Sequence, residues 1–492
     1  MVGSDTWMVR YLATDGDSMG MGKRAESRQQ EFWVATEALA DAPRHVFYDR
    51  LNALLAESGF DRFVESICET YYNEGGRPSI PPGTYFRMLL VGYFEDLSSQ
   101  RGIAWRCSDS LSLRKFLSIP LTDDTPDHSS LTRISKRLPA SVNEQVFEFV
   151  LKIAAEKKLL KGTTVAVDST TLEANAAMRA IVRKNNGDDW KTYLKKLAAE
   201  QGVEINNDDD LRRFDQQRRR KGEKKVTNAE WESKIDPDAR IGKMKDGRTH
   251  LNYKAEHVVD LDSEFIIQAE VHHGDAADTQ TIIGNLVEAQ VKLDRCFEDI
   301  NLDDPACGVI QQAVADKGYH SNEVLKSCTE LDIRSYIPER QGGERTWTDK
   351  DEQTKASFHG NRQRMKRSKG KNLQKRRSEL VERGFAHVCE TGGARKSWLR
   401  GLEKVRKRHL ISVAAHNLGL VMRSLIGFSK PRAFSAGAGL AVLCHLALLV
   451  VAVMPRRLRA YSLFLYRHFL ELFPGPEVRL TGIINVSFST GC

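Results

Sequence analysis

The sequence predicts an α/β core, a mixed sheet flanked by helices, preceded by an all-helical N-terminal region. Three observations support this prediction. Apolar residues up to about residue 140 recur at helical spacing, β-rich runs begin only at residue 163, and from there strand-like and helical runs alternate. The chain has 492 residues and an apolar share of 41%, which suits two or more domains and excludes an intrinsically disordered chain.

The N-terminal region, residues 1–140, is expected to be all-helical. Apolar residues between 47 and 67 recur at helical spacing and are followed by a break rich in proline and glycine. Pro82 is expected to open the next helix. Asp127 or His128 is expected to begin the last helix, which has two serines in its first turn.

The region after residue 140 is expected to hold the sheet. A helix at about 142–157 leads into the β-rich run 163–168, and the polar, charged stretch 176–247 is expected to be an insertion. Residues 261–263 are expected to form the turn of a hairpin. The later elements are expected to be hairpin strands at 250–260 and 265–273, a helix near 278–294, a strand from Val309 to Ala315, a helix at 321–330, a strand from Ile333 to Ile337, and helices at 376–390 and 398–422.

Two of the expected strands end on an aspartate: Asp168 in VAVDSTTLEA and Asp316 in AVADKGYHS. A buried strand that ends on a carboxylate delivers it to the sheet edge where ligands bind in α/β folds. Either aspartate alone would be explained by a turn or a helix cap, but two of them after apolar β runs favour a site. With a third acid they could hold two Mg²⁺ ions, which prefer oxygen ligands and assist phosphoryl transfer.

The third acid is expected on a later helix. Glu379 and Glu382 lie three residues apart in RRSELVERGFAHV and therefore share a helical face, so the spacing leaves both as candidates. If three carboxylates share two metal ions, they are expected to lie within about 4–8 Å of one another.

A basic strip, residues 361–377, precedes these glutamates and contains no acidic residue. A solvated loop and a surface that tracks DNA phosphates both explain such a run, and its place beside a candidate metal site favours the second. Lys317, next to Asp316, is a further candidate phosphate contact. The cations of the strip are Arg362, Arg364, Lys366, Arg367, Lys369, Lys371, Lys375, Arg376 and Arg377.

The overall charge favours a polyanionic partner, because 74 basic residues exceed 66 acidic ones by 8. The eight cysteines form no CxxC pair and no zinc-type spacing, which is typical of reduced thiols and favours the cytoplasm. The N-terminal residues lack an apolar segment, so no signal peptide is expected.

An uncharged apolar run, FSAGAGLAVLCHLALLVVAVM at 434–454, has a borderline length for a membrane span. Its glycine and alanine content and His445 in its middle weaken that interpretation. We expect a buried or dimer-forming helix there and no membrane location.

At these motifs the chain resembles a DDE transposase of a bacterial insertion sequence. The resemblance spans roughly residues 30–425 and leaves out 430–492. It is carried by blocks in a fixed order: FYDRLNALLAESGFDRFVESICETYY at 47–72, the stretch 77–117, TPDHSSLTRISKRLP at 125–139, DPDARIGKMKDGRTHLNYKAEHVVDLDS at 236–263, VADKGYHS at 314–321, LVERGFAHV at 380–388 and LRGLEKVRKRHLISVAAHNL at 399–418.

The resemblance implies that the chain consists of three parts. A helical domain at 1–140 serves DNA binding and assembly. A ribonuclease H-like catalytic domain follows at 141–425 and contains the insertion at about 176–247. A C-terminal tail with the apolar run, 426–492, lies outside the family resemblance.

The resemblance also assigns the catalytic and metal-binding acids to Asp168, Asp316 and Glu382. It favours Glu382 over Glu379 because the family's pattern surrounds Glu382. The implied cofactors are two Mg²⁺ ions, with Mn²⁺ as a substitute and no small-molecule cofactor. The implied chemistry is cleavage of DNA at the ends of the element and attack of the freed 3′-hydroxyl on target DNA.

The implied partners are double-stranded DNA, both as terminal inverted repeats and as target, and a second copy in a homodimer. The helical region is expected to bind the inverted repeats at the nucleoid in the cytoplasm. Its candidate phosphate contacts are Arg77, Arg101, Arg106, Arg114, Arg133, Lys136 and Arg137.

Other functions fit the same residues. A metal-dependent nuclease with the same core would cut DNA without joining it. A domesticated or decayed transposase would only bind DNA; the three acids argue against it, and the odd tail argues mildly for it. A membrane-anchored DNA-binding protein would rest only on the run 434–454.

Overall fold

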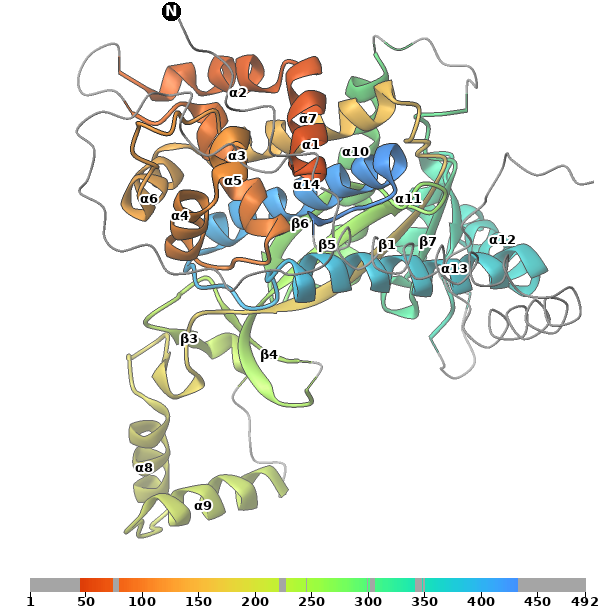
Figure 1. Cartoon of the computed structure of the whole chain (residues 1–492). Coiled ribbons are helices and arrows are strands. Elements are labelled where there is room, and N and C mark those ends of the chain that lie inside the picture. The colour runs from red at the N-terminus through yellow and green to blue at the C-terminus, as the bar shows by residue number, and fades with distance from the viewer. Residues whose placement is uncertain are drawn as a thin grey trace, which may run out of the picture. The chain divides into compact units, whose positions relative to one another are not determined.

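The computed structural model describes residues 45–431, apart from 74–78, 221–226, 245, 299, 301–305, 341–346 and 348–349 (Figure 1). The expectations for the first 44 residues, for Arg77 and for the apolar run 434–454 lie outside the described residues. All described residues belong to one compact unit.

Helices fill the first part of the described chain, as predicted. They are α1 (Val46–Glu57), α2 (Phe60–Cys68), the 3₁₀ turn η2 (Glu69–Tyr71), α3 (Pro82–Phe94), α4 (Gln100–Asp109), α5 (Leu111–Phe116), α6 (His128–Arg137) and α7 (Ala140–Glu156). Pro82 opens α3, and the Asp127 side chain caps α6 by accepting a hydrogen bond from the Ser129 backbone N–H. Ser99 and Ser110 cap α4 and α5 in the same way, because a side-chain oxygen satisfies an unpaired N–H of the first turn.

The sheet is mixed, and the expected hairpin is part of it. Its strands are β1 (Thr164–Glu173), β4 (Arg240–Lys243), β5 (Thr249–Asp260), β6 (Ile266–His273), β7 (Gln312–Ala315) and β8 (Arg334–Tyr336). They run in the order β4–β5–β1–β7–β8, and β6 also pairs with β5. β5 is antiparallel to β1, β4 and β6, whereas β1, β7 and β8 are parallel.

The stretch expected as an insertion holds a small substructure and also one strand of the main sheet. Its elements before β4 are η3 (Met178–Ala180), β2 (Ile181–Arg183), α8 (Trp190–Glu200), α9 (Asp208–Arg220), η4 (Asn228–Glu230) and β3 (Trp231–Ser233). β2 pairs with β3, and α8 and α9 share an apolar cluster around Leu194 and Phe214. β4 rejoins the main sheet at Arg240, earlier than the sequence indicated. This strand has four residues, none of them buried, so it lacks the apolar pattern of an internal strand.

Helices cover both faces of the sheet. They are α10 (Asp278–Phe297), η5 (Lys317–Tyr319), α11 (Asn322–Glu330), α12 (Glu352–Lys366), α13 (Ser368–Phe385), the π-helical turn η6 (Ala386–Thr391) and α14 (Leu402–Ile426). On β1, Asp168 contacts α13 and the next residue, Ser169, contacts α10. Because successive strand side chains point to opposite faces, α10 and α13 cover opposite faces. Helix α12 was not predicted, because its sequence is mostly polar.

Helix α14 is the central packing element, and it contacts α7, α3 and β6 (Figure 1). By length and composition it could cross a membrane, but most of it is buried inside the described part of the fold. The Asn417 side chain ties it to the sheet: Oδ1 accepts from the Ile266 N–H at 3.0 Å, and Nδ2 donates to the Ile266 carbonyl at 2.8 Å.

Three buried histidines lie on α14 and the neighbouring strand β5. His257 Nε2 lies 2.7 Å from His409 Nε2, and His416 Nδ1 lies 3.3 Å from the Tyr93 hydroxyl. Burial lowers the pKa of all three, that of His409 to about 4 and that of His416 to about 3. The folded protein therefore holds them neutral at pH 7.

We predict that His409 makes the fold sensitive to acid. Between its unfolded pKa of 6.5 and its folded pKa of about 4, only the unfolded chain gains a proton, so stability falls as pH falls. The loss is roughly 3 kcal/mol for this residue. The variant His409→Gln, which can keep a hydrogen bond to His257, should flatten the pH dependence of the unfolding free energy in chemical denaturation. The exposed His359→Gln is the control, and an unchanged slope in His409→Gln would contradict the prediction.

Candidate active site

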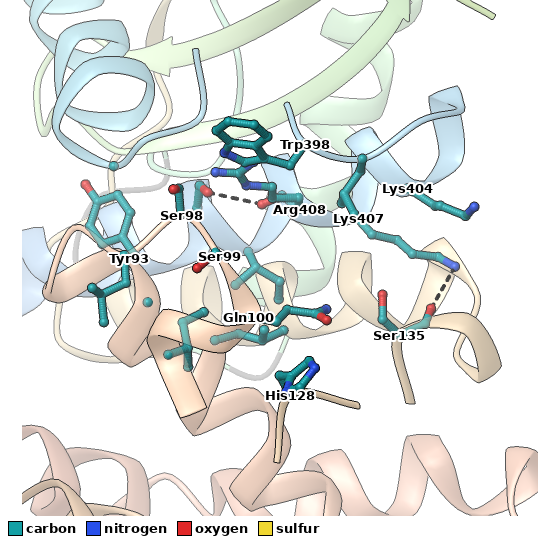
Figure 2. A pocket seen from close by; sticks show the side chains of 18 of the residues that line it. Tyr93, Ser98, Ser99, Gln100, His128, Ser135, Trp398, Lys404, Lys407 and Arg408 are labelled. Atoms are coloured by element: carbon teal, nitrogen blue, oxygen red, sulfur yellow. Dashed lines mark hydrogen bonds between the residues drawn. The ribbon is translucent and has the colours of Figure 1, made fainter. Parts of the chain in front are cut away.

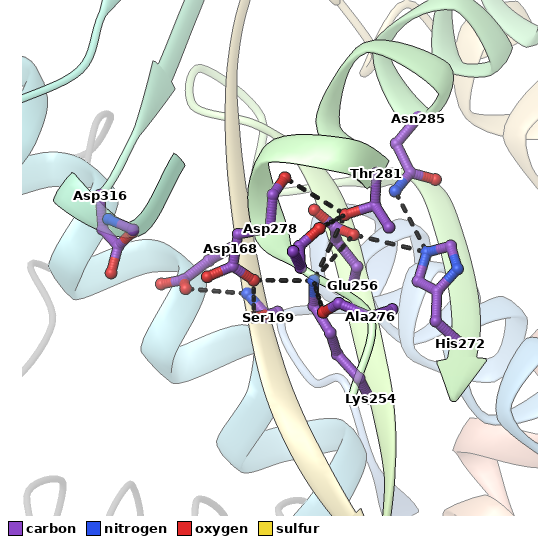
Figure 3. Close-up of polar contacts among 12 residues, drawn as sticks. Asp168, Ser169, Lys254, Glu256, His272, Ala276, Asp278, Thr281, Asn285 and Asp316 are labelled. Carbon is purple, nitrogen blue, oxygen red and sulfur yellow. Dashed lines mark hydrogen bonds and ion pairs between the residues drawn. The ribbon is translucent and has the colours of Figure 1, made fainter. Parts of the chain in front are cut away.

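Asp168 and Asp316 lie side by side, although only one of them follows the end of a strand. β1 and β7 pair in parallel with Val167 opposite Ala315, so the next residue on each strand is an aspartate. β7 ends at Ala315 as expected, but β1 continues to Glu173 because its second half pairs with β5. The expectation that the first strand ends on Asp168 is therefore wrong. Figure 3 shows the two carboxylates turned toward each other.

The Asp168 carboxylate is largely buried and accepts two hydrogen bonds. Oδ1 accepts from the Ser169 backbone N–H at 2.8 Å, and Oδ2 accepts from Nη1 of Arg377 on α13 at 2.6 Å. Burial raises the pKa of Asp168 to about 6, with a further contribution from the charges of Asp316 and Asp278 and against the lowering effect of Arg377. The anionic form of Asp168 is thus favoured by the Arg377 cation and by the hydrogen bond from the Ser169 N–H.

Asp316 caps the short helix η5. Its Oδ1 accepts from the Gly318 N–H at 2.7 Å. A Cβ at position 318 would lie 2.8 Å from Oδ1 of Asp316 and 2.8 Å from Oδ2 of Asp278, so any larger residue would displace a carboxylate. Arg340 donates to the carbonyls of Lys317, at 3.1 Å, and Gly318, which fixes this turn. The Lys317 side chain itself is exposed.

The two candidate glutamates on α13 are not joined to the aspartates. Glu382 is exposed, and its Oε1 accepts from Ser378 Oγ at 3.2 Å within the same helix. Glu379 is also exposed and lies 4.0 Å from Nη1 of Arg383. Within the described ranges neither glutamate contacts the aspartate pair. The structure therefore brings together two of the three acids named from the sequence.

A polar cluster that the sequence analysis missed lies next to the aspartate pair (Figure 3). Lys254 Nζ lies 2.7 Å from Asp278 Oδ1 and 3.7 Å from Glu256 Oε2, and His272 Nε2 lies 3.4 Å from the same glutamate oxygen. Asp278 also accepts from Ser169 Oγ at 3.2 Å. The available signal was the alternation in YKAEH, which puts Lys254 and Glu256 on one strand face.

Two protein families match separate regions of this chain. Residues 36–137 match the family Transposase domain (DUF772), and residues 312–422 match the family Transposase DDE domain. The chain therefore contains two regions that match transposase domains. The resemblance to a DDE transposase of an insertion sequence is thereby confirmed, and both matches indicate a function in DNA transposition. No curated protein and no solved structure matches the chain.

The two matches cover different parts of this transposase. The first includes helices α1 to α6, and the second runs from β7 into α14. Asp316 and Glu382 fall within the DDE match, whereas Asp168 lies between the two matches. The position of Asp168 in the site therefore rests on the strand register and its surroundings.

DDE transposases use divalent metal ions, and the aspartate pair of this transposase suits such an ion in donor type. Two adjacent carboxylates supply the hard oxygen ligands that Mg²⁺ prefers, and the buried Asp168 anion favours a neighbouring cation. Arg377 supplies that positive charge here. Within the described residues, no group of three or more His, Cys, Asp or Glu side chains is arranged to hold a metal ion. The chemistry of the two aspartates therefore suits a metal ion, but among the described residues no third acid completes a group that could hold one.

The basic strip is helical, and its cations form two groups. It spans the end of α12, Arg367 and the first part of α13. Four arginines are already paired with other residues of the chain: Arg362 with Glu339 at 2.6 Å, Arg364 with the Ser335 carbonyl at 3.0 Å, Arg376 with Asp262 at 3.1 Å and Arg377 with Asp168 at 2.6 Å. The exposed cations without an ion pair to a described residue are Lys366, Arg367, Lys369, Lys371 and Lys375. Only this second group can meet DNA phosphates without breaking an internal bond.

The N-terminal cations divide in a similar way. Arg106 forms an ion pair at 3.4 Å, and Arg114 donates to two backbone carbonyls at 2.6 Å. Arg101, Arg133, Lys136 and Arg137 are exposed, and Arg137 lies over the ring of Tyr72. These four are therefore the stronger candidates for contacts with a polyanion.

We predict that Asp168→Asn stabilises the metal-free protein at pH 8. Because the pKa of Asp168 is raised to about 6, above its unfolded value, stability is lost as pH rises from about 4 to 6, by on the order of 2–3 kcal/mol. The asparagine variant lacks this loss. In EDTA its melting temperature should exceed that of the wild type by a few degrees at pH 8, and the difference should shrink towards pH 4.

The exposed Asp124→Asn is the matched control and should show no such pH-dependent difference. A melting temperature of Asp168→Asn below that of the wild type at pH 8 would show that the Arg377 contact outweighs the cost of burying the carboxylate.

Proposed function

We propose that this chain is the transposase of an insertion sequence, which cleaves DNA at the ends of the element and joins the freed 3′ ends to target DNA. The observation that carries the proposal is the Asp168–Asp316 pair, adjacent in the register of two parallel strands. It occurs in a chain that matches transposase domains on both sides of Asp168. Paired acids in one partly buried site are typical of functional sites.

The proposed catalytic core is ribonuclease H-like. Three antiparallel strands, β6, β5 and β1, followed by the parallel strands β7 and β8, support this assignment. We retain the proposed division into a helical domain at 1–140, a catalytic domain at 141–425 and a tail at 426–492. Within it, the insertion is proposed to end before β4.

Asp168, Asp316 and Glu382 are the proposed ligands of two Mg²⁺ ions, for which Mn²⁺ could substitute. When bound, such ions activate the attacking oxygen and stabilise the leaving oxygen of the phosphodiester. The protein's own contribution is positioning: the N–H groups of residues 169 and 318 hold the two aspartates. Arg377, which now neutralises Asp168, and Glu382 lie on the same helix, α13.

DNA is the proposed partner on two surfaces. Four of the exposed cations of the basic strip, Lys366, Arg367, Lys369 and Lys371, are proposed to track backbone phosphates together with Lys317. The helical region is proposed to bind the terminal inverted repeats. A homodimer would supply one copy for each end of the element, in the cytoplasm where the DNA lies.

We predict that Asp168→Asn, Asp316→Asn and Glu382→Gln each lower both cleavage and strand transfer by at least roughly 10³-fold, because one metal site serves both steps. The measurement uses labelled element ends and target DNA in Mg²⁺. Glu379→Gln is the matched control and should stay active. Loss of activity in Glu379→Gln with activity kept in Glu382→Gln would move the third role to Glu379. Cleavage without any joining by the wild type would leave a nuclease as the function.

We predict that the strip contacts phosphates and not bases. Reversing the charge of Lys366, Arg367, Lys369 and Lys371 should weaken binding to any DNA sequence alike. The slope of log affinity against log salt should become shallower by roughly one unit for each phosphate that is no longer neutralised. The control is Arg362→Gln, whose side chain is bound internally and whose removal should leave the slope unchanged. An unchanged slope in the fourfold variant would leave the strip as a solvated surface.

A further inference from the structure

A cavity of about 310 Å³ lies between α3, α4 and α14 (Figure 2). Its walls include Leu97, Ile103, Leu399 and Ile411, and Trp398 at its edge leaves 58% of its surface exposed. The volume is about twice that of an engineered cavity of ~150 Å³ that holds benzene. Basic residues such as Lys404 and Arg408 also line the cavity, but most of its lining surface is apolar, so it suits several large apolar side chains.

The chain turns back toward this cavity after α14. Gly427 follows the helix with φ of 81°, a left-handed conformation that suits glycine and reverses the chain. A Cβ added at Gly419 would lie 2.8 Å from the Ser429 carbonyl oxygen, so residue 429 is packed against the side of α14. The segment therefore runs back along the helix, away from its C-terminal end.

The Lys430 side chain, near the end of the described chain, contacts Tyr93, one of the residues that line the cavity. Lys430 Nζ lies 2.7 Å from Asp96 Oδ1 and 4.5 Å from the centre of the Tyr93 ring. Tyr93 and Leu97, the residue after Asp96, both line the cavity. Pro431, the last described residue, is buried. Ser429 and Lys430 line a second, smaller hollow that shares Tyr93 with the cavity, so the chain leaves the described part next to the cavity.

The next residues match the cavity in chemistry and reach. The segment 434–443, FSAGAGLAVL, carries no charge and contains Phe434, Leu440, Val442 and Leu443. It begins three residues after Pro431, and three extended residues span about 10 Å. Residue 429 lies beside Gly419, and the wall residue Ser412 lies seven positions along α14 from there, which is about 10.5 Å. The five residues from 429 to 434 span more than this distance when extended.

We propose that residues 434–443 of the same chain dock in this cavity. Burial of the large side chains of the segment removes apolar surface from water on both partners. Small residues in its first half allow the backbone to approach the wall closely. The anchor at Lys430 makes docking intramolecular, so its entropic cost is only that of closing a short loop. A second copy or a membrane would have to compete with this nearby site.

The test uses the full chain with Cys444→Ser and a pair of new cysteines, Ser98→Cys at the cavity and Ala438→Cys in the segment. Under mild oxidation we expect a disulfide within one chain, identified by mass spectrometry of unreduced peptides. The matched control pairs Ala438→Cys with Ser66→Cys, which is exposed on α2. The control pair should form its disulfide at least about ten-fold more slowly.

Three results would overturn the proposal: equal rates for both pairs, a disulfide that joins two chains, or sedimentation of the protein with vesicles of phosphatidylethanolamine and phosphatidylglycerol.

A second measurement does not need cysteines. Leu440→Asp with Leu443→Asp should raise the fluorescence of an added hydrophobic dye several-fold by opening the cavity. The same change at Leu463 and Leu470, later in the tail, should not. An equal rise in both variants would also overturn the proposal.

Discussion

The register of β1 between its two neighbours is the constraint on which the site depends. The parallel pairing with β7 sets Asp168 beside Asp316, and the antiparallel pairing with β5 sets Asp168 opposite His257 and Ser169 opposite Glu256. Because strand side chains alternate, a slip of one residue would send the Asp168 side chain to the α10 face, away from Arg377. The apolar side chains of Val165 and Val167, both fully buried, hold the register in place.

Much of the fold could be predicted from local sequence. Proline and aspartate signals mark the starts of α3 and α6, and two β-rich runs with a polar turn give the hairpin. The parts that were missed depend on distant partners. β1 extends past Asp168 only because β5 continues beside it, and β4 is a strand only because β5 offers an edge. Neither partner is visible in a window of neighbouring residues.

In the candidate site, too, features with a local sequence signal could be predicted, and features that depend on distant residues could not. Two aspartates after apolar runs could be found because each has a local signal, and the second of them lies within the range of the DDE match. The ion pair between Arg377 and Asp168 joins residues 209 positions apart and carries no local signal. The same holds for the basic strip. The sequence shows its nine cations, but only the structure shows which of them already bind other residues of the protein.

The ion pair at Asp168 also has a consequence for how this centre can be loaded. The Arg377 guanidinium group already pairs with the Asp168 carboxylate. If Asp168 binds a divalent ion, as proposed, the ion would have to replace this partner. The arginine that is released prefers phosphate or carboxylate oxygens in a two-point contact. A DNA phosphate could be its new partner, and DNA binding and ion binding would then be thermodynamically coupled through Arg377.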